Sequence, residues 1–403
     1  MDPFAPAQLG KLKLKNRVLK AATFEGKTPD GVPGESLMKF HEDIAKGGIA
    51  MTTLSYCTTE ADGRIMDSQL YLHDGIMSEL QELTRRVKKA GAKISGQLAH
   101  CGHFSKNRKL QRLKNPKGPS RQFNPIGMIA GRPFAGEMDD ADIAYLVQTY
   151  RDATQIMSKA GFDAIEIHFG HGYALSQFIS PKTNKRTDRY GGSLVNRMRL
   201  PLQVLDAVKE TAGDLPVIGK ISMHDGVEGG VDWDEGVETA KMLDAAGIDG
   251  IVTSGGTSSY NPMLMFRGES INAGMVEMEK NPLVKLGWKM VGPFLHKSYP
   301  YEELYFTEEA RRINQSVQCP VIYIGGCSTR ESLDRVMSEG FEFVQLGRAL
   351  LKDPNFVNNA MADEKYVSGC THCNRCVPLI EDLDGIRCIL NDKKNAKGNP
   401  AHA

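Results

Sequence analysis

Residues 143–168 read IAYLVQTYRDATQIMSKAGFDAIEIH and contain one complete helix-to-strand unit. The segment Ile143–Ala160 has the apolar spacing of an amphipathic helix, and Gly161 follows at the position where helices commonly end. The run Ala164–His168 then has the character of a short buried strand, because parallel strands covered on both faces lack regular polar alternation. This order of helix, glycine and strand predicts a parallel α/β architecture.

The same unit recurs along the whole chain. Eight short apolar runs are predicted to be strands: Val18–Thr23, Ile49–Tyr56, Lys93–Leu98, Ala164–His168, Val217–Ser222, Ile251–Ser254, Val321–Gly325 and Phe343–Leu346. Four further helical patterns are each followed by a glycine: Leu80–Ala90, Leu202–Thr211, Gly236–Ala246 and Arg330–Glu339. Eight strand–helix repeats are typical of a (β/α)8 TIM barrel, and an open doubly wound sheet is the alternative.

Two long segments follow predicted strands on the face where barrel enzymes carry their active sites. They cover approximately residues 99–137 and 255–305. Long loops at this face usually shape a pocket. We therefore expect residues 1–360 to form a barrel with enlarged loops at its C-terminal face. Residues 361–403 should form a short cysteine-rich tail packed on that barrel.

The composition of the 403-residue chain limits its class. Its 50 basic and 49 acidic side chains give a net charge of +1, which provides no general attraction to nucleic acid or anionic membranes. No apolar run approaches the roughly 20 residues needed to span a bilayer, and the N-terminus lacks the pattern of a secretory signal. We expect a cytoplasmic protein that acts on a small molecule, with a homo-oligomer left open.

Four of the eight cysteines lie close together near the C-terminus: Cys370, Cys373, Cys376 and Cys388. In a chain without a signal peptide, such a cluster indicates metal or redox chemistry rather than disulfides. Four thiolates suit either tetrahedral zinc or an iron–sulfur cluster.

Polar side chains gather at the predicted strand ends. Gln97 lies near the end of the third strand, and His168 ends the fourth, with His171 and Tyr173 just beyond it. Two histidines and a tyrosine within six positions favour a catalytic role over a structural one. Lys220 stands inside the otherwise apolar run VIGKIS, where a buried ammonium needs an anionic partner.

Glycines follow the seventh and eighth predicted strands. Gly325 and Gly326 come directly after one strand, and Gly347 precedes Arg348 after the other. Barrels commonly hold a phosphate at these two loops, where small residues let the anion approach backbone N–H groups. We predict a phosphate site there, with Arg348 neutralising the charge.

The segment HFGHGYALSQFISPKTNKRTDRYGGSLVNRMRL, residues 168–200, resembles the signature of the old yellow enzyme family of FMN-dependent NAD(P)H oxidoreductases. That signature has a first histidine, then histidine or asparagine three positions on, followed by GY, QF, SP, RTD and YGGS. Shorter matches occur at 14–22 (LKNRVLKAA), 96–103 (GQLAHCGH), 324–331 (IGGCSTRE) and 346–354 (LGRALLKDP). The resemblance covers approximately residues 5–360.

The resemblance implies an ene-reductase that receives its electrons from NAD(P)H through FMN. His168 and His171 would bind the carbonyl oxygen of an α,β-unsaturated carbonyl substrate, and Tyr173 would protonate its α-carbon. The flavin would be bound by Ala22, Thr23, Gln97, Lys220, Gly325, Gly326, Gly347 and Arg348. Lys220 would be the cation beside the flavin ring, where it raises the electron affinity of the flavin.

Departures from the family pattern leave other activities open. Phe24 stands where the family often has Thr or Cys, Ala22 where it often has Pro, and His103 where it often has Arg. The alternatives are a dehydrogenase or demethylase on the same flavin, or a barrel that binds a phosphate ligand without redox chemistry.

The barrel also resembles that of 2,4-dienoyl-CoA reductase, a larger relative that binds a [4Fe–4S] cluster through four similar cysteines. In the relatives three residues separate the second and third cysteines, whereas two separate Cys373 from Cys376. A [4Fe–4S] cluster, zinc and no metal all stay open.

Overall fold

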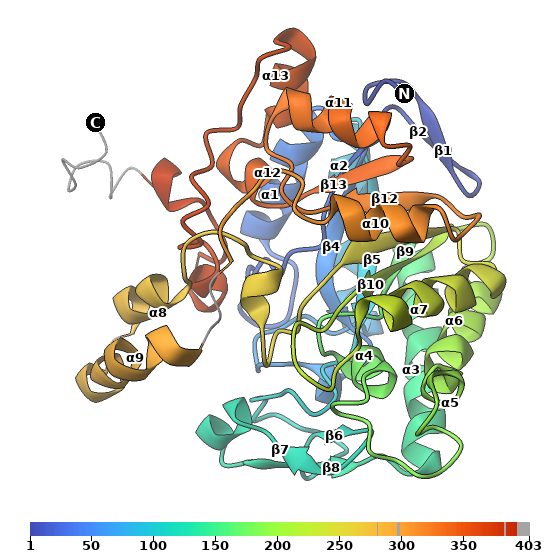
Figure 1. The fold of residues 1–403 in the computed structure, drawn as a ribbon, viewed down its shortest axis with the longest axis vertical. Helices are drawn as coiled ribbons and strands as arrows, with labels where there is room; N and C mark the ends of the chain where they lie inside the picture. The colour runs from blue at the N-terminus through green and yellow to red at the C-terminus, as the bar shows by residue number, and fades with distance from the viewer. Residues whose placement is uncertain (280, 296–298, 383, 393–403) are drawn as a thin grey trace.

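The computed structural model describes residues 1–279, 281–295, 299–382 and 384–392. Its centre is a closed barrel of eight parallel strands, in the order β10-β11-β12-β13-β3-β4-β5-β9, with β9 pairing back to β10 (Figure 1). The strands are β3 (Val18–Lys20), β4 (Met51–Thr58), β5 (Lys93–Ala99), β9 (Ala164–His168), β10 (Val217–Ser222), β11 (Gly250–Ser254), β12 (Val321–Ile324) and β13 (Phe343–Leu346). The predicted TIM barrel is confirmed, and the open-sheet alternative is wrong.

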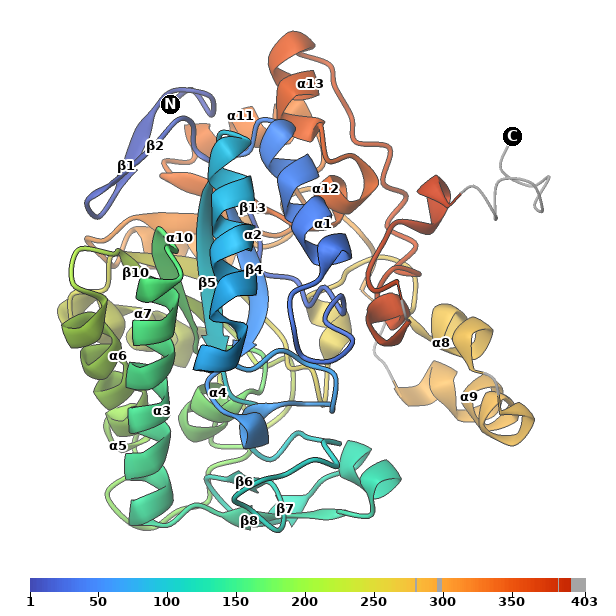
Figure 2. The same ribbon diagram turned by 180° about the vertical axis from the view of Figure 1, so that it is seen from behind.

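Helices surround the barrel, as Figures 1 and 2 show from opposite sides. Each helix packs an apolar stripe onto the strands; in α2 the buried stripe includes Leu80, Leu83 and Val87. Gly161 after α3 has φ +84°, a left-handed conformation that glycine adopts without steric cost. The main helices are α1 (Glu35–Lys46), α2 (Met77–Lys89), α3 (Asp140–Lys159), α6 (Arg199–Ala212), α7 (Trp233–Ala245), α10 (Thr307–Asn314), α11 (Arg330–Ser338), α12 (Arg348–Lys352) and α13 (Phe356–Ala362).

A hairpin at the N-terminus closes one end of the barrel. Its strands β1 (Ala7–Leu9) and β2 (Leu12–Leu14) pair antiparallel. Leu9 and Leu14 pack on inward-facing side chains of the barrel strands, which include Leu19, Met51 and Ile218. The barrel interior at this end is therefore a packed apolar core.

The opposite end carries the two enlarged loops that the sequence predicts. The first contains the small sheet of β6 (Lys117–Gly118), β7 (Gln122–Phe123) and β8 (Phe134–Glu137), drawn at the bottom of Figure 1. The second contains α8 (Asn272–Met278) and α9 (Pro282–Leu295), which project to one side. Two short helices, α4 (Ala174–Ile179) and α5 (Leu194–Arg197), follow β9.

The C-terminal tail runs along the side of the barrel and contacts it repeatedly. The backbone N–H of Ile386 donates a hydrogen bond to the Glu25 carbonyl oxygen at 2.8 Å. Glu381, in the short helix Pro378–Glu381, forms an ion pair with Lys106 at 2.6 Å. These contacts hold the described part of the tail against the barrel.

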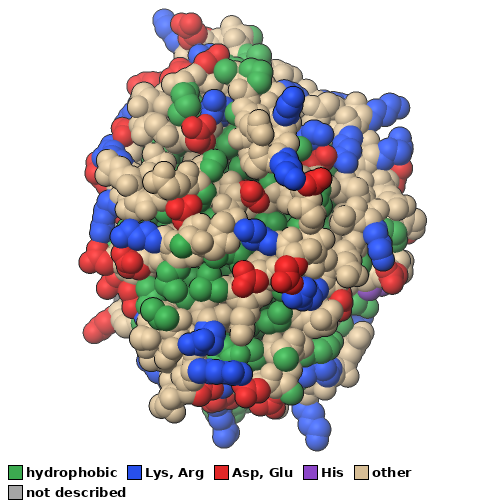
Figure 3. Space-filling model, turned by 90° about the vertical axis from the view of Figure 1, so that its right-hand side faces the viewer, with side chains coloured by type: hydrophobic (Ala, Val, Ile, Leu, Met, Phe, Trp, Pro, Cys, Tyr) green, Lys and Arg blue, Asp and Glu red, His purple; other side chains and the backbone are tan. Residues whose placement is uncertain are grey.

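The surface carries both signs of charge. Lys and Arg side chains alternate with Asp and Glu side chains over the face drawn in Figure 3, in keeping with the near-zero net charge. None of the helices within the described ranges is long and apolar enough to cross a membrane.

Candidate active site

A cavity with an empty volume of about 770 Å³, open solvent included, lies at the C-terminal ends of the barrel strands. It is lined by the turn after β3, the ends of β10 to β13 and one residue of the tail: Ala21, Ala22, Thr23, His171, Lys220, Ser254, Met265, Phe266, Tyr301, Tyr305, Phe306, Ile324, Gly325, Gly326, Cys327, Ser328, Gln345, Gly347, Arg348, Ala349 and His372. Eight of the predicted site residues therefore share one cavity.

One end of the cavity is formed by the predicted phosphate-binding residues. Gly326 has φ +68°, and a Cβ there would lie 2.6 Å from the Glu302 carbonyl oxygen, so the close packing requires glycine. The Arg348 guanidinium is fixed by hydrogen bonds from Nη1 to the Arg267 carbonyl oxygen at 2.8 Å and to Asn374 Oδ1 at 2.6 Å. This end combines exposed backbone with a fixed cation, as a phosphate requires.

The floor of the cavity carries polar groups that lack partners. The Lys220 ammonium lies 3.1 Å from Glu166 Oε1, but it is not aligned for a hydrogen bond with any described residue. Gln345 Nε2 donates to Glu166 Oε2 at 2.9 Å, whereas its buried Oε1 has no partner within the described ranges. An unsatisfied donor and acceptor facing one cavity fit the polar edge of a flavin ring.

The sequence predicts that Gln97 binds the flavin. In the structure, Gln97 is not among the residues that line the cavity. Its Nε2 donates to Glu166 Oε1 at 2.6 Å, and its Oε1 accepts from Ser55 Oγ at 3.3 Å. These two bonds keep its amide inside the barrel, below the cavity. Gln345 of β13, which the sequence analysis missed, contributes the amide on the wall instead.

A buried ion pair supports the turn that follows β3. Lys20 Nζ lies 2.6 Å from Glu25 Oε1 and also donates to the Thr53 carbonyl oxygen at 3.0 Å. Glu25 Oε2 accepts from the Ser55 N–H at 3.1 Å. The two charged side chains therefore span the turn between them, which places Ala22 and Thr23 on the cavity wall.

The two predicted catalytic histidines lie together beside the cavity, with ring centroids 4.8 Å apart. His168 Nδ1 accepts the Gly170 N–H at 3.3 Å, so its proton lies on Nε2, a buried atom without a described partner. His171 has φ +60°, and its Nε2 lies 2.8 Å from Ser254 Oγ. Burial lowers the pKa of His168 well below its usual value and that of His171 to about 3, so both rings are neutral donors.

Tyr173 precedes α4 and packs against His168, with ring centroids 4.8 Å apart. Its hydroxyl lies 2.7 Å from the hydroxyl of Tyr56 and 3.4 Å from Ser258 Oγ. Burial raises the pKa of Tyr173 to about 12, against the opposing effect of these hydrogen bonds. Tyr173 therefore keeps its proton at neutral pH.

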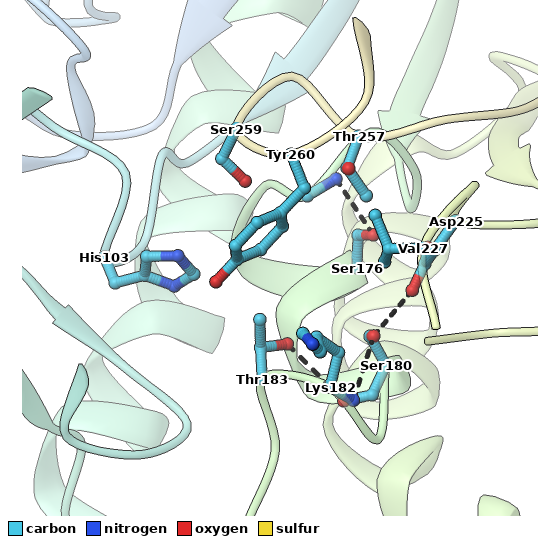
Figure 4. A pocket seen from close by; sticks show the side chains of 11 residues that line it. His103, Ser176, Ser180, Lys182, Thr183, Asp225, Val227, Thr257, Ser259 and Tyr260 are labelled. Carbon is cyan, nitrogen blue, oxygen red and sulfur yellow. Dashed lines mark hydrogen bonds between the residues drawn. The ribbon is translucent and has the colours of Figure 1, made fainter. Parts of the chain in front are cut away.

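A smaller pocket is lined mostly by polar residues and includes Gly172, which lies between His171 and Tyr173 in the sequence (Figure 4). The hydroxyl of Tyr260 points toward the His103 ring across this pocket. Burial lowers the pKa of His103 to about 4, so this position is neutral where the family often has arginine. Lys182 also lines this pocket.

The described cysteines of the tail do not form a metal-binding group in the structure. No group of three or more His, Cys, Asp or Glu side chains within the described ranges is placed to hold a metal ion. Burial raises the pKa of the Cys376 thiol to about 12 and also raises those of Cys370 and Cys388. The metal site predicted from the sequence is therefore not shown by the described residues, and it stays a prediction.

The tail instead contributes to the cavity wall. The His372 ring stacks on Tyr301, with centroids 3.3 Å apart, and both residues line the cavity. Asn374 accepts from Arg348 and donates to the carbonyl oxygens of Phe266 and Glu269. The cysteine-rich tail thus contacts the cavity through His372, which lines it, and through Asn374, which binds Arg348.

The barrel and its cavity define a class, the α/β-barrel oxidoreductases that hold a flavin at the C-terminal ends of their strands. The family described as NADH:flavin oxidoreductase / NADH oxidase matches residues 2–260, and the chain belongs to this family. It is therefore an NAD(P)H-dependent flavin oxidoreductase of the old yellow enzyme type, with FMN and NAD(P)H as its cofactors. The non-redox alternative is wrong.

Curated relatives and solved structures agree with this assignment. The chain is 39% identical to 4,4'-dithiodibutanoate disulfide reductase of Rhodococcus erythropolis, over 96% of this chain and 95% of that protein. It is 29% identical to an NADH oxidase of Thermoanaerobacter brockii, of which it spans only 56%. The structure of a 2-naphthoyl-CoA reductase superposes with a TM-score of 0.79 at 22% identity, covering 100% of this chain and 58% of that one, and so supports the fold.

Proposed function

We propose that this chain is an ene-reductase that reduces the C=C bond of α,β-unsaturated carbonyl compounds with electrons from NAD(P)H. One observation carries the proposal: the buried Nε2–H of His168 has no partner among the described residues, and the His168 ring lies beside the rings of Tyr173 and His171. A carbonyl oxygen would satisfy this donor, and the phenol beside it is a proton source.

FMN, when bound, accepts a hydride from NAD(P)H and supplies it to the β-carbon of the substrate. The His168 Nε2–H donates a hydrogen bond to the carbonyl oxygen, where negative charge develops. Ser254 fixes the His171 ring for the same task through its 2.8 Å contact. Tyr173 gives its proton to the α-carbon, since a carbanion-like carbon is basic enough to deprotonate a phenol. Lys220 would supply a positive charge at the floor of the cavity, beside the bound flavin.

Disulfide reduction is the second candidate, favoured by the 39% identity to 4,4'-dithiodibutanoate disulfide reductase along nearly its whole length. In that reaction a hydride adds to one sulfur, the S–S bond breaks, and the second sulfur leaves as a thiolate. A thiolate of ordinary pKa, about 8.5, is stable near neutral pH and needs a proton donor far less than a carbanion does.

Anaerobic stopped-flow kinetics test both functions. The enzyme is reduced with one equivalent of NADH or NADPH and mixed with 2-cyclohexenone, or with 4,4'-dithiodibutanoate in a parallel series. Saturable reoxidation of the flavin by cyclohexenone, with cyclohexanone as product, supports the ene-reductase. Reoxidation only by the disulfide, with two thiols formed per flavin, overturns it in favour of the second candidate.

We also propose that the described residues of the tail, 361–382 and 384–392, form a clasp that helps retain FMN. Replacing Asn374 with alanine removes the acceptor of Arg348 and the anchor of Phe266 at once. We expect FMN affinity to fall about tenfold, the equivalent of one charge-assisted hydrogen bond, in a titration of apoprotein followed by flavin fluorescence. Asn391→Ala is the matched control, because Asn391 lies in the same tail but binds Lys352 at 2.8 Å. Equal effects of both changes would contradict the clasp.

A further inference from the structure

Tyr56, near the C-terminal end of β4, contacts the proposed proton donor directly. Its hydroxyl oxygen lies 2.7 Å from the Tyr173 hydroxyl oxygen, and the two ring centroids are 4.9 Å apart. Phe24 stacks on the other side of the Tyr56 ring, with centroids 5.3 Å apart and planes 8° from parallel. Phe24 is one of the departures from the family pattern, and the stacking gives it a task in holding Tyr56.

In the structure the Tyr173 hydroxyl donates this hydrogen bond to the Tyr56 oxygen. Tyr173 has a single hydroxyl proton, and this proton must point to the substrate α-carbon at the moment of transfer. Both hydroxyls then rotate, and Tyr56 donates to the Tyr173 oxygen. Ser258 Oγ, 3.4 Å from the same oxygen, is a weaker second donor.

We propose that Tyr56 is a positioning residue for proton transfer, which stabilises the tyrosinate form of Tyr173 by donating a hydrogen bond to it. The inference rests on the proposed role of Tyr173. The β-carbon receives a hydride with its electron pair, and the electrons of the C=C bond move toward the carbonyl oxygen. The Tyr173 O–H bond then breaks, its proton forms a C–H bond at the α-carbon, and its electron pair stays on the phenol oxygen. Water restores the proton after product release.

Burial makes this assistance necessary. The apolar surroundings raise the pKa of Tyr173 to about 12, and a charged phenolate without donors would be costly there. The same surroundings raise the pKa of Tyr56 well above its usual value, with Tyr173 as a further cause, so Tyr56 keeps its proton and stays a donor. The charge left by proton transfer therefore has a fixed hydrogen-bond partner within the protein.

The test is the Tyr56→Phe holoenzyme in anaerobic stopped-flow measurements of flavin reoxidation by 2-cyclohexenone from pH 6 to 10. We expect the rate constant at neutral pH to fall about 10- to 50-fold. The solvent deuterium isotope effect on this step should increase. Ser258→Ala should change the rate in the same direction by a smaller factor, and it tests the idea again if Tyr56→Phe folds poorly.

Three comparisons decide the interpretation. Tyr150→Phe removes another buried phenol, on α3, whose hydroxyl has no partner in the described part of the chain, and it should leave the rate and the pH profile unchanged. An unchanged rate, pH profile and isotope effect in Tyr56→Phe, together with a slow Tyr173→Phe, would overturn the role of Tyr56 alone. If Tyr173→Phe were as fast as the unmodified enzyme, the proposed function of Tyr173 would fail and this inference with it.

Discussion

Replacing Tyr173 with phenylalanine is expected to slow reoxidation of the reduced enzyme by 2-cyclohexenone about 10²- to 10³-fold, within the usual contribution of a general acid. Phenylalanine keeps the ring that packs on His168 and Tyr56, so the change removes one hydroxyl with little effect on shape. Flavin reduction by NAD(P)H needs no proton from Tyr173 and is the internal reference, expected to change by no more than about twofold.

The acceptor gives this variant a second use. With a disulfide as acceptor, the leaving thiolate needs no immediate proton, and we expect a loss of only about fivefold or less. The ratio of the two losses thus separates the proposed functions within a single variant. Equal losses in flavin reduction and in reoxidation would show that Tyr173 acts on structure or flavin binding, and it would no longer be the proton donor.

Replacing Lys220 with methionine is expected to reduce FMN affinity at least about 100-fold, because the cavity would lose a buried cation from its wall. The folded protein should also lose about 3–5 kcal/mol of stability, since Glu166 is fully buried and would remain without its ion-pair partner. Flavin content per chain, measured by absorbance after denaturation, and the thermal unfolding midpoint report the two effects.

A second substitution separates flavin binding from stability. In Lys220→Met with Glu166→Gln the buried charge is gone, so the unfolding midpoint should recover while the FMN affinity stays low. Lys241→Met is the surface control, because Lys241 pairs with the exposed Glu238 at 2.8 Å and lies outside the cavity. If the single Lys220 variant retained full flavin content and midpoint, this lysine would have no part in holding the flavin.

The order of the barrel strands could be predicted because each strand has a local sequence signal, which is a short apolar run after a glycine turn. The end of β12 shows the limit, since the predicted strand includes Gly325, whereas the strand ends at Ile324. Gly325 has φ +134° and lies where the chain turns toward the cavity. Such a conformation is incompatible with continued pairing, although the apolar pattern gives no sign of it.

The site was predictable where one residue contradicts its surroundings. Lys220 stands out in an apolar strand, and it does lie on the cavity floor. Glu166 and Gln345 break the apolar pattern of β9 and β13 in the same way, so the same signal could have identified both. Tyr56 carries no such signal, because tyrosine is an ordinary strand residue and its contact with Tyr173 spans 117 positions of sequence.

The cysteine tail shows what a local motif leaves out. Its spacing is a strong local pattern, yet His372 is the tail residue that lines the cavity, and Asn374 holds the cavity residue Arg348; both stand between the cysteines. Both have positive φ, +56° and +54°, and so curl the segment against the barrel. A motif defined by cysteines predicts thiol chemistry and says nothing about the residues between them.

The left-handed backbone at His171 limits which amino acids can replace this histidine. Among side chains that can donate a hydrogen bond, histidine and asparagine enter this region of backbone space with little strain, whereas β-branched or long residues do not. The signature of the family has His or Asn at this position. Substitutions at residue 171 would therefore be limited by two requirements. The side chain must tolerate the left-handed backbone, and it must donate a hydrogen bond to the substrate. The first requirement applies even before any substrate is bound.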